Sequence, residues 1–476
     1  MSDVVVVGNG IVGLSIALEL ADRGNSVTVV GDPSRHSAAT MAAGAMLGCF
    51  AESTPSCIGT AQGALKLKAA VDARLLWGAQ LERLESLGGR RVEYTSDGTL
   101  VVLNAIGTQA IDSANFSAIR QAAAKYGEPI ESVDPTDVPW IQAEDLARPM
   151  DAVFLPGEKS LDARALVPAF DAALQALNVR FSGTDGVELV FAGDRAVGIR
   201  DASGTVHRGD QIVIAAGVGT QGFVDQLGAE GRKIPPIISG VGTSILVEAG
   251  SVDLPSSVVR TPNRAFACGL HLVPYGGGRA YIGATNVLSV TPHSQPELGD
   301  LIFLLDCAVR QLHRGLHSAQ VSKFNVGNRP VPVDGYPLVG SAGPENVWIA
   351  SGTYRDGLHL SPLIGTAIAD RISNSAHSDD LDAFTPVRRP ITETSRQAVV
   401  DTTVAHMVAT GVETMWRTPV DWPSLFSDHM RRAFNVAAKS LSDSITPPPD
   451  VLALCTNNPR AMQIVRDYYR SWSDVH

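Results

Sequence analysis

A glycine-rich hexapeptide near the N-terminus is the first stretch whose residue types and spacing could do chemistry. GNGIVG, residues 8 to 13, follows an apolar segment and precedes a helical pattern. In GxGxxG, Gly8 permits a tight turn, Gly10 lets the backbone approach a pyrophosphate, and Gly13 lets helix and strand pack closely. The phosphates would then lie at a helix N-terminus. An ordinary strand-to-helix turn is the alternative.

The acidic residue that binds the ribose in such sites is expected about 20 residues after the glycines. Here Val30 is followed by Gly31, and the carboxylate comes one position later, at Asp32. Either the register is shifted or the ribose contact is made differently. An exposed turn aspartate before Pro33 is the alternative.

Arg355 stands between two glycines in GTYRDGLHLSP, residues 352 to 362. Further along this stretch, Ser361 as N-cap and Pro362 in the first turn predict that a helix begins there. The dipole of that helix could stabilise negative charge at its N-terminus.

A run of small residues, HSAATMAAGAMLGCFAES at 36 to 53, suits backbone that lies against a flat ring system, because larger side chains would collide. A closely packed helix start explains the same composition.

These stretches need a framework of strands and helices. Residues 4 to 30 show a strand, a glycine turn, a helix ending at Gly24 and a second strand, which is a βαβ unit. Residues 161–177 predict a helix and 207–220 a buried strand, and 347–372 repeat the order of strand, glycine turn and helix. One nucleotide-binding sheet built from discontinuous segments is therefore expected.

The intervening segments have a different character. Residues 90–104 and 264–286 alternate in polarity and carry turn residues, which favours antiparallel strands. After about Ser373 the chain becomes polar and rich in proline, and helical patterns follow, among them 424–441 and 458–472.

The composition excludes several classes of protein. The 476 residues carry a net charge of −11 with no basic run, which argues against a nucleic-acid partner. No apolar stretch has the length of a membrane span, and Met1 to Asp3 leads straight into a strand, so we expect a cytoplasmic protein without a signal peptide. The five cysteines form no CxxC pair, so neither disulfides nor a metal site is indicated.

Taken together, the motifs resemble the D-amino-acid oxidase superfamily of FAD enzymes, and are most similar to its glycine oxidase and sarcosine oxidase branch. The resemblance runs from residue 1 to about 373. It rests on GNGIVG, the small-residue run ending in MLG and followed by AE, LDARALVPAF, IVIAAG, LVPYGGGRAYIGATN, GNRPVPVDGYPLVG and GTYRDGLHLSPLIG, in that order.

The resemblance implies an α/β fold with a discontinuous, Rossmann-like FAD-binding domain, an antiparallel-sheet substrate domain and a helical C-terminal extension. The FAD-binding domain would comprise residues 1–75, 150–230 and 325–373, and the substrate domain 76–149 and 231–324. The extension, 374–476, lies outside the resemblance. It could be an add-on packed on the body, a lid, a dimer contact or a dock for a larger substrate or carrier.

The resemblance also implies the FAD contacts. Ile11 and Val12 would meet the pyrophosphate, Gly31 and Asp32 the ribose, and Val187 the adenine. No cysteine lies in 347–372, and Met41 stands where one branch has its linking histidine, so non-covalent FAD is expected. The complete set of expected contacts is Gly8, Gly10, Ile11, Val12, Gly13, Gly31, Asp32, Ala39, Thr40, Gly44, Ala45, Met46, Val187, Gly217, Thr353, Tyr354, Arg355, Asp356, Gly357, Leu358 and His359.

For the substrate, the resemblance implies that Arg329 of GNRP and Arg355 share a carboxylate. A planar fork of donors suits a carboxylate, and the pair would fix which α-hydrogen faces flavin N5. Structural ion pairs are the alternatives: Arg329 with Asp334, and Arg355 with Asp356 or a backbone carbonyl.

Three positions depart from the family pattern. His271 stands where glycine oxidases have tyrosine, and Asn286 follows GAT where an apolar residue is usual, so both make the pocket more polar. The extra Ala45 would displace the loop over the ring. His271 could accept a proton, bind substrate or simply be packed in the core.

The expected reaction oxidises the C–N bond of an amino acid or another carboxylate-bearing amine by hydride transfer to flavin N5, giving an imine and, with O2, hydrogen peroxide. The partners would be a small amine and O2, with no nucleic acid, no membrane and a possible homo-oligomer. Two alternatives remain: a dehydrogenase that passes electrons to a partner and acts on a larger biosynthetic amine, and a non-catalytic flavin-binding scaffold.

Overall fold

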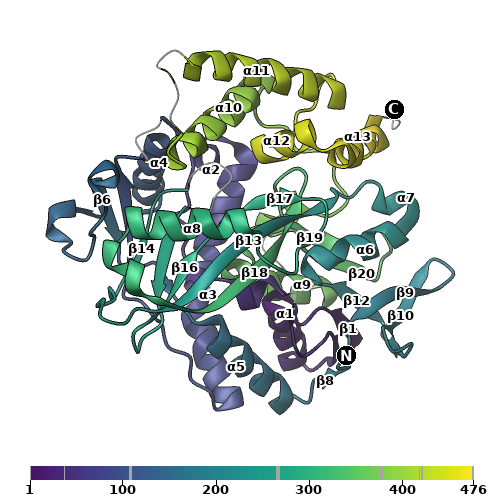
Figure 1. Ribbon diagram of the computed structural model, residues 1–476. Coiled ribbons are helices and arrows are strands. Elements are labelled where there is room, and N and C mark those ends of the chain that lie inside the picture. Colours follow the sequence, from purple (N-terminus) through teal and green to yellow (C-terminus); the bar gives the residue numbers. More distant parts are fainter. Residues whose placement is uncertain are drawn as a thin grey trace.

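The apolar N-terminal segment forms an inner strand of a six-stranded sheet in the computed structural model (Figure 1). β1 (Asp3–Val7) pairs in parallel with β2 (Ser26–Val30) and with β12 (Gln211–Ile214). Four valines of β1 are buried, as expected for a parallel strand covered on both faces. The sheet order is β19 (Leu338–Ser341), β20 (Val347–Ser351), β12, β1, β2 and β8 (Arg180–Phe181), with only β19 antiparallel to its neighbour. The structure describes residues 2–36, 38–106, 110–263, 269–375, 379–416, 419 and 422–473.

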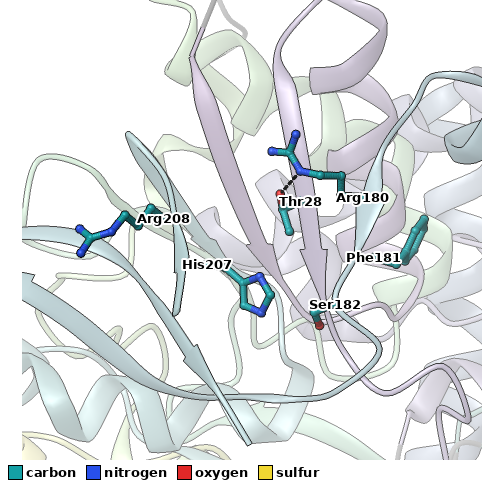
Figure 2. Close-up of a pocket in the computed structure, with 6 residues that line it drawn as sticks. All are labelled: Thr28, Arg180, Phe181, Ser182, His207 and Arg208. Carbon is teal, nitrogen blue, oxygen red and sulfur yellow. Dashed lines mark hydrogen bonds between the residues drawn. The ribbon is translucent and has the colours of Figure 1, made fainter. Parts of the chain in front are cut away.

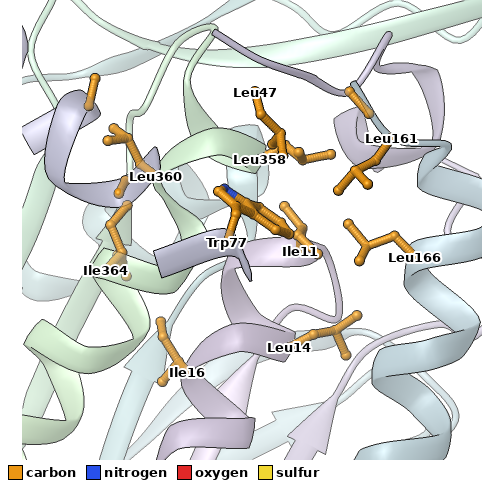
Figure 3. Packing of buried hydrophobic residues seen from close by; sticks show 14 of the residues in the cluster. Ile11, Leu14, Ile16, Leu47, Trp77, Leu161, Leu166, Leu358, Leu360 and Ile364 are labelled. Atoms are coloured by element: carbon orange, nitrogen blue, oxygen red, sulfur yellow. The ribbon is translucent and has the colours of Figure 1, made fainter. Parts of the chain in front are cut away.

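Four helices supply most of the helical residues of the main core, which they form with this sheet. Trp77 of α3 is only 1% exposed, and Figure 3 shows it among Ile11, Leu358 and other apolar side chains of neighbouring elements. Its indole N–H donates to the carbonyl of His359 at 3.0 Å. The helices are α1 (Ile11–Asp22), α3 (Ala61–Gly88), α5 (Ala163–Ala176) and α9 (Gly357–Ile372).

A small antiparallel sheet packs near the strand ends of the parallel sheet. It consists of β9 (Gly186–Ala192), β10 (Arg195–Asp201) and β11 (Val206–Arg208). Leu189 and Ile199 join Val5, Val7 and Val30 in one apolar cluster, which fixes β9 over the end of β2.

A nine-stranded sheet forms the second part of the molecule. Its longest pairing joins β13 (Ile237–Glu248) and β18 (Gln320–Pro332), which run antiparallel with Gly240 opposite Arg329. The other strands are β17 (Val287–Ser289), β16 (Arg279–Gly283), β15 (His271–Pro274), β14 (Val258–Arg260), β4 (Thr99–Asn104), β6 (Pro149–Leu155) and β5 (Glu131–Val133).

The C-terminal region adds four helices, drawn in yellow and yellow-green at the top of Figure 1. Their buried face packs against Ile238, Val331 and Val333 of the nine-stranded sheet and the segment after it. Arg388, just before these helices, makes a buried pair with Asp334, with N–O distances of 2.9 and 2.8 Å. The helices are α10 (Arg396–Glu413), α11 (Trp422–Leu441), α12 (Pro449–Asn457) and α13 (Pro459–Ser473).

The predicted fold class is confirmed: both kinds of sheet and the helical C-terminal region are present. Four expected domain boundaries fall inside elements, at residue 75 in α3, 150 in β6, 230 in α7 (Gly228–Gly231) and 325 in β18, and the division into domains stays a prediction. Within 90–104 only 99–104 forms a strand. In the described part of the chain, no helix combines the length and apolar character that crossing a membrane requires.

The predicted helix start at Ser361 is wrong. α9 begins four residues earlier, at Gly357, and Pro362 lies inside it. The backbone N–H of Leu360 already donates to the carbonyl of Asp356, which closes the first helical turn before the proline is reached. Ser361 is fully buried in the helix and does not cap it.

Candidate functional site

The glycine turn of residues 8–13 has the geometry that its spacing predicts. Gly8 has φ +107°, and a Cβ there would collide with the carbonyl oxygen of Ala215. A Cβ on Gly13 would collide with the carbonyl of Gly8. Gly10 precedes α1 without a side-chain cap, and the first turn of α1 holds no acidic residue. This helix start therefore fits a bound pyrophosphate, which its backbone amides and dipole would stabilise.

Segments far apart in the chain meet at this helix start. The N–H of Ile11 donates to the hydroxyl of Thr40 at 3.1 Å. A Cβ on Gly357, the first residue of α9, would lie 4.0 Å from Val12. Gly217, φ +57°, follows the Ala215–Ala216 pair that packs on Gly8, and its carbonyl accepts from Ser351. The structure thus brings these predicted FAD contacts together.

At the ribose end, Asp32 is exposed. Its carboxylate accepts from the N–H of Ser34 at 2.8 Å, and this backbone hydrogen bond lowers the pKa of Asp32. Gly31 packs against Asn9, since a Cβ would lie 2.7 Å from the Asn9 side chain. The turn-aspartate alternative accounts for the carboxylate contact seen here, and a ribose contact stays a prediction.

The predicted adenine contact, Val187, lies on β9 and is half exposed. Its neighbour Gly186 packs closely on Val7 and Val30, because a Cβ there would lie 3.0 and 3.4 Å from them. Val187 therefore lies close to the end of β2, where Gly31 and Asp32 begin.

The small-residue run forms a short 3-10 helix, Ala39–Ala42, followed by the two-residue strand β3, Met46–Leu47. Gly44 contacts the ring of Tyr281, whose hydroxyl donates to the carbonyl of Ala42 at 3.2 Å. Ala45, the extra alanine, has φ +52°. It takes a left-handed backbone that costs a non-glycine residue about 1 kcal/mol. The run thus lies against the nine-stranded sheet, as a segment facing a ring would.

Within the segment 353–359, the side chains of Leu358 and His359 are engaged in packing contacts. Leu358 belongs to the main core, and the imidazole of His359 donates to the carbonyl of Ala70 at 2.6 Å. Burial lowers the pKa of His359, which favours the neutral ring. A Cβ on Gly357 would lie 2.6 Å from the hydroxyl of Thr353. Contacts of Leu358 and His359 with FAD would therefore come from their main chain.

Arg329 extends across β13. A Cβ on Gly242 would collide with its guanidinium, so this approach requires glycine. One terminal nitrogen donates to the carbonyl of Thr285 and to the side-chain oxygen of Asn286, both at 3.1 Å. The alternative pairing with Asp334 is not what the structure shows, because Arg388 holds both oxygens of that carboxylate.

Arg355 lies over the ring of Tyr354 at 5.2 Å. The carboxylate of Asp356 forms its ion pair with Lys66 of α3, at 2.9 Å. Tyr354 has φ +54°, and its hydroxyl accepts from the side-chain nitrogen of Asn286. Tyr354 thus links the two arginines: Arg355 lies on its ring, and Arg329 reaches its hydroxyl through Asn286.

His271 is buried on β15, with its ring stacked on Tyr281 at 5.6 Å. Burial lowers its pKa to about 3, and the nearby Arg260 cation adds to the effect. The neutral ring donates from Nδ1 to the carbonyl of Gly269 at 3.0 Å. Its Nε2 is then a hydrogen-bond acceptor, and the low pKa means that it accepts a hydrogen bond but takes up a proton only weakly.

Two charged residues that the sequence motifs did not identify, Arg260 and Glu52, lie near His271. Arg260 is 1% exposed and pairs with Glu52 at 2.9 Å. Burial acts to raise the pKa of Glu52, but Arg260 and Arg355 outweigh it and lower the pKa to about 2. Glu52 stands directly after the small-residue run, in the AE dipeptide, which is the only sequence signal for it.

The C-terminal extension also reaches the site, which no motif indicated. The hydroxyl of Tyr354 donates to Asp450 at the start of α12, at 3.0 Å. The Arg355 cation acts to lower the pKa of Asp450 and that of His406 in α10. Burial lowers the pKa of His406 to about 3.

A cleft of about 280 Å³ lies elsewhere, at the edge of the parallel sheet (Figure 2). Arg180 donates to Thr28 across β8 and β2 at 3.1 Å. None of the predicted site residues lines this cleft. The lining residues are Thr28, Arg180, Phe181, Ser182, His207 and Arg208.

Comparison with known proteins gives several matches. The chain is 28% identical over 401 residues to a glycine oxidase of Geobacillus kaustophilus, an alignment covering 81% of this chain and 97% of that protein. It is 26% identical to a bifunctional protein ThiO/ThiG of Nostoc sp. over 78% of this chain, which spans about half (52%) of that protein.

The fold has solved counterparts as well. The crystal structure of glycine oxidase from Geobacillus kaustophilus superposes with a TM-score of 0.69 at 23% identity, covering 82% of this chain and 99% of the other. A family model described as FAD dependent oxidoreductase matches residues 3–371. Because this match spans most of the chain and the glycine turn fits a dinucleotide, the protein belongs to the FAD-dependent oxidoreductase family, with FAD as its cofactor.

Proposed function

We propose that the protein oxidises the C–N bond of an amino acid or another carboxylate-bearing amine, releasing an imine, with O2 as electron acceptor and hydrogen peroxide as product. Bound FAD would supply the redox chemistry by accepting the hydride at N5. The observation that carries the proposal is the convergence of Arg329 and Arg355 on Tyr354. The names of the glycine oxidase relatives support an amine substrate.

The two arginines would hold the substrate carboxylate. Arg329 is fixed by two hydrogen bonds from one terminal nitrogen and by close packing on Gly242. Arg355 lies on the Tyr354 ring, one residue before the Asp356–Lys66 pair. An anchored guanidinium loses less side-chain entropy when it binds, and a fixed carboxylate orients the α-carbon for hydride transfer.

Of the two neutral polar side chains, His271 would bind the amine group of the substrate. His271 presents Nε2 as an acceptor at neutral pH, because its pKa is about 3. It can hold an amine N–H without becoming charged. Both ends of the Asn286 amide are hydrogen-bonded, to Arg329 and to Tyr354. Asn286 would therefore orient these two side chains and not bind the amine.

The test uses the visible spectrum of the purified protein and anaerobic addition of amino acids and N-alkyl amino acids. Bleaching of the flavin band by one carboxylated amine is expected. Arg329→Ala and Arg355→Ala should each lower kcat/KM for that amine about a hundredfold, as expected when one partner of a charge-assisted pair is lost. Peroxide is measured after air is admitted.

Arg120→Ala is the matched control, because this arginine is partly exposed and pairs with Asp151 on the outer part of the nine-stranded sheet. It should bleach like the parent protein. A yellow protein that no carboxylated amine reduces, or arginine variants that match the parent, would refute the proposal. Bleaching without peroxide would replace O2 by another electron acceptor.

A further inference from the structure

We propose that Asp450, in the C-terminal extension, is a positioning residue of the active site that acts through Tyr354 and Asn286 on Arg329. The inference rests on the proposed function and adds the extension, which lies outside the family match of residues 3–371, to the substrate site.

A continuous chain of hydrogen bonds joins the extension to the arginine. Arg329 donates to Asn286 Oδ1 at 3.1 Å, and Asn286 Nδ2 donates to the hydroxyl of Tyr354. That hydroxyl donates to Asp450 Oδ2 at 3.0 Å. Each group in the chain thus has a fixed direction of donation.

Asp450 reinforces the direction of donation that the guanidinium of Arg329 favours. A tyrosine hydroxyl has one proton, and a primary amide has an acceptor end and a donor end. Because Tyr354 gives its proton to Asp450, it accepts from Asn286 Nδ2, and the amide oxygen faces Arg329. Without the carboxylate, the hydroxyl proton could turn to Asn286. That arrangement would require the amide to turn its NH2 group toward the guanidinium, where two donors repel, so Asp450 disfavours a competitor of the orientation that Arg329 needs.

The carboxylate is held in place from both sides. Its other oxygen, Oδ1, accepts from the N–H of Val451 at 2.9 Å. Val451 and Leu452, the next residues of α12, are fully buried in the cluster between the extension and the body. Tyr354 is fixed as well, because its backbone N–H donates to the carbonyl of Pro330, next to Arg329.

Two hydrogen-bond donors and one cation lie around Asp450. Burial raises its pKa, and the hydrogen bonds from Tyr354 and Val451 and the Arg355 cation oppose that rise only in part. A carboxyl with two donors aimed at it acts as an acceptor.

The experiment measures the dissociation constant of acetate, a carboxylate without an amine, from the change in flavin absorbance of the FAD-loaded protein. Asp450→Ala and Tyr354→Phe are each expected to weaken acetate about tenfold, or about 1.4 kcal/mol, as for one lost hydrogen bond. The double variant should be no weaker than Tyr354→Phe, because both act through one chain.

Asp450→Asn separates position from charge. Its oxygen can still accept from Tyr354, so acetate should weaken at most about threefold. If the charge of Asp450 alone mattered, removing it beside Arg355 would tighten acetate equally in the Asn and Ala variants. Asp467→Ala, on the exposed face of α13, is the matched control and should equal the parent protein.

The outcomes separate the two proposals. Variants that bind acetate as the parent does, or more tightly, overturn the role of Asp450 and leave the proposed function intact. A parent whose flavin responds to acetate but is bleached by no amine refutes the proposed function alone. A parent that responds to neither removes both. If Asp450→Ala does not fold, the Asn and Phe variants carry the test.

Discussion

The glycine turn at residues 8–13 and the hydrogen-bonded chain around Tyr354 both belong to the candidate site, but they are built differently. In the turn, Gly13 packs on Gly8, five residues away. In the chain, the three hydrogen bonds span 43, 68 and 96 residues. The turn works through backbone shape, and the chain through side-chain donors and acceptors. Adding a Cβ to the glycine turn should therefore disrupt its packing. Removing a group from the hydrogen-bonded chain should instead change the orientation of the side chains that remain.

The largest effect is expected from Gly8→Ala, which attacks the turn. The added Cβ would collide with the carbonyl of Ala215 at φ +107°, a backbone that alanine rarely adopts. We expect a loss of about 4 kcal/mol or more in the free energy of unfolding, and purified protein without flavin. Denaturant unfolding and the absorbance of released FAD measure the two effects.

Gly78→Ala is the matched control, because a Cβ at this position in α3 has no atom within 4 Å. It should be neutral or gain up to about 1 kcal/mol, since alanine favours helix. A Gly8→Ala protein that keeps its FAD and its stability would show that the turn is less constrained than its contacts indicate.

This contrast explains what the sequence could predict. The βαβ unit and the glycine turn depend on residues within one short stretch, so their pattern is readable, and the α/β fold class is confirmed. Ser361 and Pro362 wrongly predict the start of α9, because they carry a helix-start signal, while the hydrogen bond that closes the first turn, from Leu360 to Asp356, is made by the backbone alone.

The substrate end was predictable only in part. Arg329, Arg355 and Asn286 were identified through a resemblance, and the structure links them through Tyr354. Asp450 follows three prolines in a region without a family pattern, and its contact with Tyr354 spans 96 residues. No periodicity or spacing encodes such a contact. It arises from the packing of α12 on the body, which only the folded chain shows.

The second largest effect is expected from Arg388→Ala, which tests how strongly the C-terminal extension is held on the rest of the protein. Arg388→Ala would leave the buried carboxylate of Asp334 without its bidentate partner. Removing one partner of a buried ion pair typically costs about 3 to 5 kcal/mol. We expect that loss in denaturant unfolding, with acetate binding weakened as well because α12 carries Asp450.

Arg431→Ala removes an arginine of α11 whose ion pairs, with Asp401 and Asp428, are exposed. It should leave the free energy of unfolding by denaturant unchanged, since exposed pairs contribute little. If Arg388→Ala unfolds like this control, the extension is held mainly by its apolar face, and the buried pair adds nothing measurable.

A smaller effect is expected from pH. Burial lowers the pKa of His271 and of His406 to about 3, from an ordinary value of 6.5. Between these values the unfolded chain binds protons that the folded chain does not. The free energy of unfolding should therefore fall as pH decreases below 6.5, by about 1.4 kcal/mol per pH unit for each group.

In His271→Asn, the slope of the free energy of unfolding against pH should be shallower by the contribution of one histidine, because asparagine does not titrate. The asparagine amide can still donate a hydrogen bond to Gly269. His429→Asn, on the exposed part of α11, is the control and should keep the parent slope. The measurement is denaturant unfolding at several values between pH 4.5 and 7.5. Equal slopes in His271→Asn and the parent would mean that His271 does titrate in the folded protein.

The smallest effect is expected at the ribose end, where Asp32 is exposed and already accepts from Ser34. Asp32→Ala should weaken FAD about fivefold, and Asp32→Asn, which keeps an acceptor, about twofold, as for one solvent-exposed hydrogen bond. The fluorescence of released FAD on dilution measures the affinity, and Asp194→Ala, in the exposed turn between β9 and β10, is the control. This end of the site combines the glycine turn with the single side chain of Asp32. The FAD affinity of the Asp32 variants therefore distinguishes binding by the backbone from binding by the side chain. An Asp32→Ala protein with parental affinity would assign Asp32 to the turn alone and leave FAD binding here to the glycine backbone.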